Sequence, residues 1–390
     1  MRYNPLDNDP LKKSLSWKNF KPKNSDSNGK ITEKFLKNST LQYVNAQKGT
    51  ITVSLSSGID SSLCLAILRE LFPDKKIIAI CGVFKHGYDE SKTAKKIAKQ
   101  FDAIFKTVNI DSVFTNMPEL ISLSKQPKWN SYHHLISKEA RKFGNTLFIG
   151  DGADELFGGY VFRYNKFLTI SRPSDNWKIK SINYLECHNR DWVPDQESMF
   201  GKAINFSWNT IISNFKPYFS NPLDSLTQVM LADFNGKLLH DFIPASHTIS
   251  KHYQLKNAAI FLNDELIKFA CSLPLEQKYS QEKQKGKLIL RKIAKRYGIE
   301  HIDEKRGFSP SLLFDWNDRG KKVCESYLLN EKSYIYSKKL INFNWVIRSF
   351  EKVENDGDIR YLNRLISILA LEVWYRIFIT NELSSTQKLR

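Results

Sequence analysis

Short apolar runs alternate with helical patterns over the first 150 positions of the chain. The apolar runs, rich in β-branched residues, predict buried strands at 50–55, 76–83, 103–108 and 146–149. Apolar residues at helical spacing predict helices at 31–46, 60–71, 91–101 and 132–143. Continuously apolar strands that alternate with helices are typical of a parallel sheet covered on both faces. The sequence therefore predicts an α/β fold.

Beyond about residue 165 the strand pattern stops and helical spacing predominates. Four segments of this half predict helices, at 226–239, 263–272, 286–297 and 361–379. The first 30 residues are polar with little apolar periodicity, which predicts an extended or loosely docked arm. We therefore expect an N-terminal arm at 1–30, an α/β core at 31–170 and a mostly helical continuation at 171–390.

The first chemical feature is the turn between the strand at 50–55 and the helix at 60–71. Its small and polar residues are Ser56, Ser57, Gly58, Asp60, Ser61 and Ser62. Small residues let backbone N–H groups approach an anion, and the start of the following helix adds free N–H groups and a positive dipole end. Asp60 would repel bare phosphate, so its presence indicates a bridging Mg²⁺. The alternative is a serine-rich helix cap with an acidic first turn.

The second feature is the run GDGADELFGGY at 150–160, directly after the strand at 146–149. It places three carboxylates, Asp151, Asp154 and Glu155, within five residues. Like charges this close repel unless a cation or a proton separates them, and Mg²⁺ carrying polyphosphate supplies such a cation. An acidic surface turn is the alternative, which the apolar residues on both sides disfavour. Because ligands bind beyond the carboxyl ends of parallel strands, we expect both features at that edge of the sheet.

Net charge and composition limit the classes of ligand and the compartments that are expected for this protein. The formal net charge of +18 favours nucleotide phosphates, pyrophosphate or nucleic acid, and a solvated cationic surface is the alternative. No run reaches the ~18 apolar residues of a membrane helix, and the N-terminus lacks the apolar centre of a signal peptide, so we expect a cytoplasmic protein without a membrane partner. Five scattered cysteines without CxxC spacing predict buried thiols, and the histidines show no metal-ligand spacing.

Both features resemble signatures of known enzymes. The first is similar to the S-G-G-x-D-S loop of ATP pyrophosphatases, with Ser57 at the second position in place of the first glycine. A serine there carries strain if the position needs a positive φ. The second resembles the G-D/E-G-A/G/S-D-E-x-F-G-G-Y signature of asparagine synthases and their relatives. Further stretches are similar to that family in the family's own order: YDES at 88–91, GKLILR at 286–291 and KRGFS at 305–309.

The resemblance implies an adenine nucleotide alpha hydrolase-like fold and an enzyme that uses ATP to make an acyl-adenylate, which an amine then attacks. It implies that ATP or pyrophosphate is bound by Ser56, Ser57, Gly58, Asp60, Ser61, Ser62 and Gly150, with Leu55 and Val83 bordering the adenosine. It implies that Asp60 and Asp154 hold Mg²⁺. Lys305 matches the lysine that neutralises charge during adenylation, and Asp151 the position proposed as general base for the amine.

The chain also departs from the family. The family's glutaminase half begins with a catalytic cysteine, whereas Arg2 is the second residue here and Cys64 the first cysteine. We therefore expect free ammonia, an amine or a separate glutaminase subunit as the nitrogen source. On the acceptor side, Lys256, Ala258 and Asn263 align with a glutamate, an arginine and an aspartate of the family. The carboxylate substrate thus stays open, with aspartate the first candidate. The segment 183–207 has no counterpart in the family.

Three functions follow from these observations. The first is an AMP-forming amide ligase of the asparagine synthase type. The second is a pyrophosphate-loop enzyme that adenylates RNA for base modification, which the charge favours and the lack of a cysteine pair or zinc ribbon disfavours. The third is a non-catalytic paralogue that binds nucleotide, which Ser57 favours and the retained Asp60, Asp151, Asp154 and Lys305 disfavour.

Overall fold

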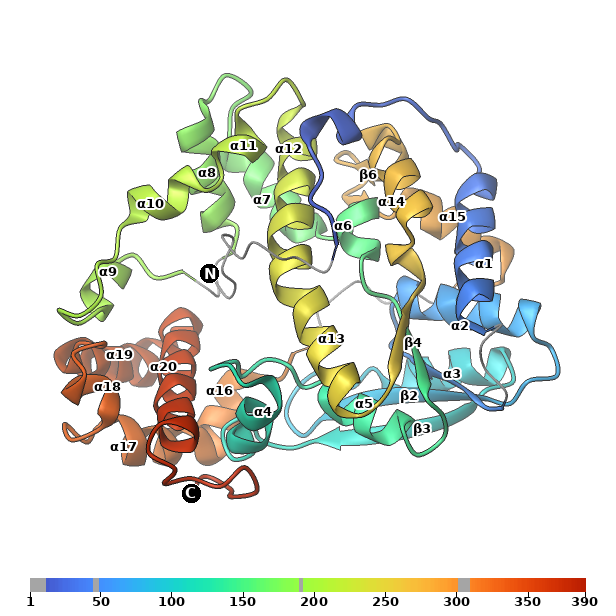
Figure 1. The fold of residues 1–390 in the computed structure, drawn as a ribbon. Coiled ribbons are helices and arrows are strands. Elements are labelled where there is room, and N and C mark those ends of the chain that lie inside the picture. The colour runs from blue at the N-terminus through green and yellow to red at the C-terminus, as the bar shows by residue number, and fades with distance from the viewer. Residues whose placement is uncertain (1–11, 45–48, 189–191, 301–308) are drawn as a thin grey trace.

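The centre of the α/β region is a five-stranded parallel sheet, and four of its strands come from residues 51–149 (Figure 1). The computed structural model describes residues 12–44, 49–188, 192–300 and 309–390. The strands lie in the order β3-β2-β1-β4-β5, and every pairing between neighbours is parallel. They are β1 (Ile51–Ser54), β2 (Ile77–Phe84), β3 (Ile104–Ile110), β4 (Thr146–Ile149) and β5 (Lys256–Ala259). The parallel sheet and the first four strands confirm the predictions from the sequence.

Helices cover both faces of the sheet. Alternate residues of β2 show this, because Ile77 and Ala79 belong to a core that includes α2, whereas Ile78 and Ile80 pack in a smaller core with Ile136 of α5. The helices α2 (Ile59–Leu71), α3 (Ser91–Gln100) and α5 (His134–Ala140) pack on the strands, and α1 (Lys30–Val44) and α15 (Leu288–Arg296) pack against α2. The α/β fold with two covered faces is therefore confirmed.

β5 comes from the half of the chain in which only helices were expected. Its sequence, KNAA, is short and has no β-branched residue, so its intrinsic preference for a strand is low. It pairs with β4 from Thr146↔Lys256 to Ile149↔Ala259. The pairing with β4, rather than local propensity, makes this segment a strand.

The remaining described chain is mostly helical, as predicted (Figure 1). Its longest run joins α12 (Ser225–Ala232), the π-helical segment η3 (Asp233–Phe242) and α13 (Ile243–His252). Pro244, near the start of α13, has no N–H to offer the preceding turn, a feature that accompanies widened helical turns. The predicted helices at 263–272 and 361–379 are α14 (Asp264–Cys271) and α20 (Ile359–Phe378).

A second hydrophobic core lies among the C-terminal helices and α4 (Met117–Ser124). It is built around the buried indoles of Trp316 and Trp345. The C-terminal helices are α16 (Leu312–Asp315), η6 (Trp316–Gly320), α17 (Lys321–Leu328), α18 (Tyr334–Ser337), α19 (Phe343–Asp356) and α20. The segment 161–219 forms α7 (Val161–Ile170), α8 (Trp177–Glu186), α9 (Gln196–Met199), α10 (Trp208–Ser213) and α11 (Lys216–Phe219). Within the described ranges, no helix has both the length and the apolar content to cross a bilayer.

The described part of the predicted N-terminal arm is docked on the helical half. The backbone N–H of Leu15 donates to Oδ1 of Asn235, and Nδ2 of Asn235 donates back to the Leu15 carbonyl, both at 2.8 Å. The short η1 helix (Trp17–Phe20) follows, and its Phe20 is buried. These contacts fix the approach of the chain to α1.

The strand order reverses between β1 and β4. The chain passes from β1 to β2 on one side of the sheet, whereas β4 and β5 lie on the other side of β1. Loops that follow strands on either side of such a reversal diverge and leave a ligand crevice at the carboxyl edge. The serine-rich turn follows β1 and the acidic run follows β4, so both lie where a ligand is expected.

Candidate active site

The serine-rich turn is held in shape by its own hydroxyl groups. Oγ of Ser56 and Oγ of Ser61 lie 2.9 Å apart, and the N–H of Gly58 donates to Oγ of Ser56 at 3.1 Å. Oγ of Ser62 donates to the Gly58 carbonyl at 2.8 Å, and α2 begins at Ile59. These hydroxyls stabilise the loop, and their binding of pyrophosphate remains a prediction.

Ser57 holds an anionic group. Its backbone N–H and its Oγ both donate to Oε2 of Glu90, at 3.1 and 3.0 Å. Glu90 immediately precedes α3 and belongs to the YDES stretch. Two converging donors on one carboxylate oxygen show that the turn accepts negative charge. Ser57 does not have a positive φ, so serine at this position causes no strain of the kind considered from the sequence.

The acidic run packs directly against the serine-rich turn. Gly150 follows β4, and a Cβ built on it would lie only 2.9 Å from the Cβ of Asp60 and 3.3 Å from the backbone nitrogen of Ser61. Such a spacing is too short for real Cβ atoms, so glycine is needed for this close approach. The short helix α6 (Ala153–Phe157) then carries Asp154 in its first turn. The structure thus brings the two predicted segments together at the sheet edge.

Lys287 joins Asp60 and Asp154. Its Nζ lies 2.5 Å from Oδ2 of Asp60 and 2.6 Å from Oδ1 of Asp154. The side chain of Lys287 is only 6% exposed, and those of the two aspartates are 17% and 12% exposed. Lys287 was not predicted as part of the site from the sequence, although the GKLILR stretch contains it. The signal that could have pointed to Lys287 is its place between Gly286 and the amphipathic helix that follows.

The backbone around Lys287 is tightly placed. Lys287 adopts a left-handed conformation, with φ 56° and ψ 37°, just before α15 begins. Its N–H donates to the Phe157 carbonyl at 2.9 Å, at the end of α6. A Cβ on Gly159 would lie 1.8 Å from Oδ1 of Asp154 and 2.5 Å from Cε of Lys287. The glycines of the acidic run therefore make room for the lysine.

The two aspartates form a donor set that fits Mg²⁺ carrying polyphosphate. Because both oxygens lie within hydrogen-bonding distance of one Nζ, they are at most about 5 Å apart. Oδ1 of Asp60 is buried and has no hydrogen-bond partner among the described residues. In the same part of the chain, no group of three or more His, Cys, Asp or Glu side chains is arranged to hold a metal ion. Phosphate and water oxygens would have to complete the octahedral shell, as is usual for Mg²⁺.

Glu155, the third carboxylate of the acidic run, is directed into the protein interior. Its Oε1 accepts from the Tyr160 hydroxyl at 2.5 Å, and burial raises the pKa of Glu155. The Arg163 guanidinium stacks on the Tyr160 ring at 3.8 Å and pairs with the buried Asp233. The repulsion expected among three carboxylates is thus relieved by separating one of them from the other two.

Three of the other residues predicted for the site lie at or next to the carboxyl ends of β1, β2 and β4. Leu55 follows β1, is buried, and donates its N–H to the Ile80 carbonyl at 2.8 Å. Val83 pairs with Asn109 next to the end of β2, so it lies at the same carboxyl edge. Asp151 is partly exposed directly after Gly150. Lys305 lies outside the described residues.

The residues that differ from the family on the acceptor side have structural partners. Lys256 and Ala258 belong to β5 and pair with Thr146 and Phe148 of β4. Asn263 caps α14, since its Oδ1 accepts from the N–H groups of Glu265 at 3.0 Å and Leu266 at 3.3 Å. An aspartate would cap this helix equally well, so the substitution does not disturb the fold.

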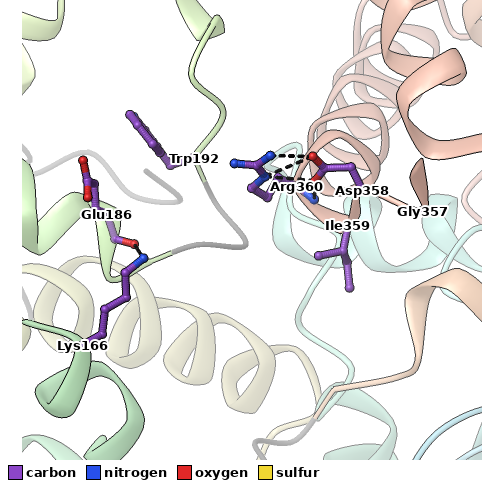
Figure 2. A pocket seen from close by; sticks show the side chains of 7 residues that line it. All are labelled: Lys166, Glu186, Trp192, Gly357, Asp358, Ile359 and Arg360. Atoms are coloured by element: carbon purple, nitrogen blue, oxygen red, sulfur yellow. Dashed lines mark hydrogen bonds and ion pairs between the residues drawn. The ribbon is translucent and has the colours of Figure 1, made fainter. Parts of the chain in front are cut away.

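A cavity of about 490 Å³ opens beside the segment that lacks a family counterpart (Figure 2). Its lining comes from α7, α8, Trp192 and the turn between α19 and α20, and consists of Lys166, Glu186, Trp192, Gly357, Asp358, Ile359 and Arg360. Nζ of Lys166 donates to the Glu186 carbonyl at 2.8 Å, and Arg360 pairs with Asp358 at 2.6 Å. None of the site residues predicted from the sequence is among these seven.

Known proteins resemble this chain over most of its length. The family model described as asparagine synthase matches residues 37–376. The glutamine-hydrolyzing asparagine synthetase 1 of Bacillus subtilis is 23% identical, over 92% of this chain and 61% of that protein. A putative asparagine synthetase of Mycobacterium tuberculosis is also 23% identical, over 88% of this chain and 57% of that protein. The chain therefore spans about three fifths of the length of these relatives.

Among solved structures, a U34-tRNA thiolase from Methanococcus maripaludis matches 58% of this chain and 80% of its own chain. The sequence identity is 17% and the TM-score is 0.26.

Proposed function

The chain belongs to the asparagine synthase family, and we propose that it is an ATP-dependent amide ligase that releases AMP and pyrophosphate. It activates a carboxylate, with aspartate the first candidate, as an acyl-adenylate that ammonia or an amine then attacks. One observation carries the proposal. Asp60 and Asp154, from the loops after β1 and β4, converge on a single cationic group at the carboxyl edge of the sheet.

In the first step, a carboxylate oxygen of the substrate forms a bond to the α-phosphorus of ATP. The bond from that phosphorus to the bridging oxygen breaks, and pyrophosphate leaves with the electron pair. Such a displacement depends mainly on positioning and on neutralising charge. Asp60 and Asp154 would hold Mg²⁺, which supplies positive charge to the pyrophosphate. Ser57 offers an N–H and a hydroxyl for a phosphate oxygen, and their convergence on Glu90 supports this role.

In the second step, nitrogen attacks the acyl carbon and AMP departs. The attacking amine must lose a proton, and a carboxylate within reach is a suitable general base. Asp151, partly exposed beside Gly150, is our candidate for that base. Free ammonia, an amine or ammonia from a separate glutaminase subunit would supply the nitrogen. Lys287 and Lys305 are the candidate cations for the charge that develops on the phosphates.

The test is exchange of labelled pyrophosphate into ATP, with Mg²⁺ and a panel of carboxylic acids. Exchange with aspartate supports asparagine synthesis, whereas exchange only with another acid reassigns the substrate. We expect Asp60→Asn and Asp154→Asn each to lower exchange by at least about 10²-fold with an unchanged circular dichroism spectrum.

The matched control is Asp356→Asn, at an exposed aspartate on α19. It should exchange like the unaltered chain. Normal exchange in either site variant would refute the metal assignment. A chain that neither binds ATP nor exchanges pyrophosphate with any acid would refute the proposed function.

A further inference from the structure

We infer that Lys287 is an internal counter-ion for Asp60 and Asp154 and that it makes binding of the divalent cation depend on the nucleotide. The inference deepens the proposed function and rests on it, because it concerns the order in which metal and ATP enter that site. In this role Lys287 is a positioning residue, which acts through its contact with the two carboxylates.

The ammonium and the metal compete for the same oxygens. Nζ of Lys287 lies 2.5 Å from one aspartate oxygen and 2.6 Å from the other. Mg²⁺ binds carboxylate oxygens at about 2.0–2.1 Å, so an ion that used both oxygens would stand where Nζ stands. One of the two cations therefore excludes the other.

Lys287 is held in this position by its surroundings. Its left-handed backbone is costly for a residue with a Cβ, and its N–H is tied to Phe157 at 2.9 Å. The preceding Gly286 packs against α6 so closely that a Cβ on it would lie 1.9 Å from the Gly158 carbonyl oxygen. A surface lysine would swing away freely, whereas this side chain is almost completely buried.

A bare divalent cation binds at this site only against a large free-energy cost. It has to lose its hydration and remove a buried ammonium from two carboxylates, and the two positive groups then repel each other in a medium of low dielectric constant. A cation that arrives with a polyphosphate avoids this, since phosphate oxygens complete its shell and accept the displaced ammonium. Oδ1 of Asp60 is buried and has no hydrogen-bond partner among the described residues, so a bound cation would compensate this oxygen as well.

The experiment measures Mn²⁺ binding to the full chain by electron paramagnetic resonance, with and without a non-hydrolysable ATP analogue. We expect the unaltered chain to bind free Mn²⁺ at least about tenfold more weakly than Mn²⁺ with the analogue. Lys287→Met should bind free Mn²⁺ at least about tenfold more tightly than the unaltered chain. Lys295→Met, at an exposed lysine of α15, is the matched control and should behave like the unaltered chain.

Two outcomes would overturn the inference. One is an unaltered chain that binds free Mn²⁺ as tightly as it does with the analogue, a result that needs no variant to fold. The other is a folded Lys287→Met protein whose affinity for free Mn²⁺ is unchanged. If Lys287→Met folds only when Mn²⁺ is added, the inference is supported. Failure of the proposed function is distinguishable, because it appears as absent ATP binding and absent pyrophosphate exchange in the unaltered chain.

Discussion

Arg163 and Asp233 form a two-pronged ion pair in the protein interior, with Nη1 2.9 Å from Oδ1 and Nη2 3.1 Å from Oδ2. Their side chains are 5% and 0% exposed. Removing one partner of a buried pair leaves a charge without compensation and costs about 3–5 kcal/mol. We therefore expect Arg163→Met to lower the free energy of unfolding, measured in urea, by about 3–5 kcal/mol.

The exposed pair of Lys352 and Asp356 on α19 is the matched control, and Lys352→Met should change the free energy of unfolding by less than about 1 kcal/mol. Combining Arg163→Met with Asp233→Leu should recover part of the loss, because no buried charge is then left alone. Equal effects of Arg163→Met and Lys352→Met would contradict this interpretation.

His188 should make the protein less stable in mild acid. Nδ1 of its ring lies 2.8 Å from the Tyr184 carbonyl, and Nε2 lies 2.6 Å from the Arg163 guanidinium, which suits a neutral ring that accepts from Arg163. Burial and the Arg163 charge lower the pKa of His188 to about 3. In the unfolded chain His188 has the ordinary histidine pKa of about 6.5 and binds a proton below that pH. In the folded protein it stays neutral down to about pH 3, so the free energy of unfolding falls as the pH drops from about 6.5 toward 3.

The expected contribution of His188 is a loss of about 2 kcal/mol in the free energy of unfolding between pH 7 and pH 5. Urea denaturation at the two pH values measures it. His188→Gln keeps an acceptor for Arg163 but cannot bind the proton, so its loss over this range should be smaller than that of the unaltered chain. An equal loss in both proteins would rule out His188 as the source.

Gly159 should be intolerant of a side chain. A methyl group there would lie 1.8 Å from Oδ1 of Asp154 and 2.5 Å from Cε of Lys287. We expect Gly159→Ala to lower the free energy of unfolding by about 1–3 kcal/mol and pyrophosphate exchange by at least about 10²-fold. Gly58→Ala is the comparison for stability, since its Cβ meets only Oγ of Ser56 at 3.2 Å, and its loss should stay below about 1 kcal/mol. Equal stability losses would contradict the close packing.

Asp151 should act after adenylation. If it takes the proton of the attacking amine, Asp151→Asn leaves pyrophosphate exchange unchanged and slows amide formation by about 10²–10⁴-fold. Parallel assays of exchange and of amide product on the same preparation separate the two steps. Equal losses in both assays would assign Asp151 to the nucleotide site, as we expect for Asp154.

Glu90 should compete with phosphate for Ser57. Because its carboxylate accepts both the N–H and the hydroxyl of Ser57, an incoming anion has to displace it. Glu90→Gln weakens the contact with Ser57. We expect this variant to bind pyrophosphate more tightly, with a binding free energy more favourable by about 1 kcal/mol, as measured calorimetrically without metal. Glu119→Gln, at an exposed glutamate paired with Lys138, should leave the affinity unchanged. Weaker binding by Glu90→Gln would instead make Glu90 part of the anion site.

The sequence was informative where local pattern decides structure. The β-branched run at 50–55 and the apolar run at 146–149 predicted strands whose carboxyl ends carry Asp60 and Asp154, and parallel pairing then brought the two segments together. Both inferences use short-range patterns and one general rule about parallel sheets. The family membership was visible for the same reason, since its signatures are contiguous.

Lys287 and β5 show what the sequence could not reveal. Lys287 reaches Asp60 across 227 positions of the chain, and its position depends on a left-handed backbone and on the glycines that flank α6. No local periodicity encodes such a contact. The KNAA segment of β5 becomes a strand only because the exposed edge of β4 accepts it. In the sequence Glu155 cannot be distinguished from its acidic neighbours. The structure distinguishes it, because its carboxylate accepts a hydrogen bond from the buried Tyr160 hydroxyl.

The late arrival of β5 has a consequence for biosynthesis. While the ribosome is still making the roughly one hundred residues between β4 and β5, the outer edge of β4 has unpaired backbone N–H and C=O groups. Such an edge pairs readily with other nascent chains, so this interval is the period in which aggregation or chaperone capture is most favoured. A chain truncated before residue 256 would keep that edge unpaired permanently. We expect such a chain, for example residues 1–170, to accumulate as insoluble material.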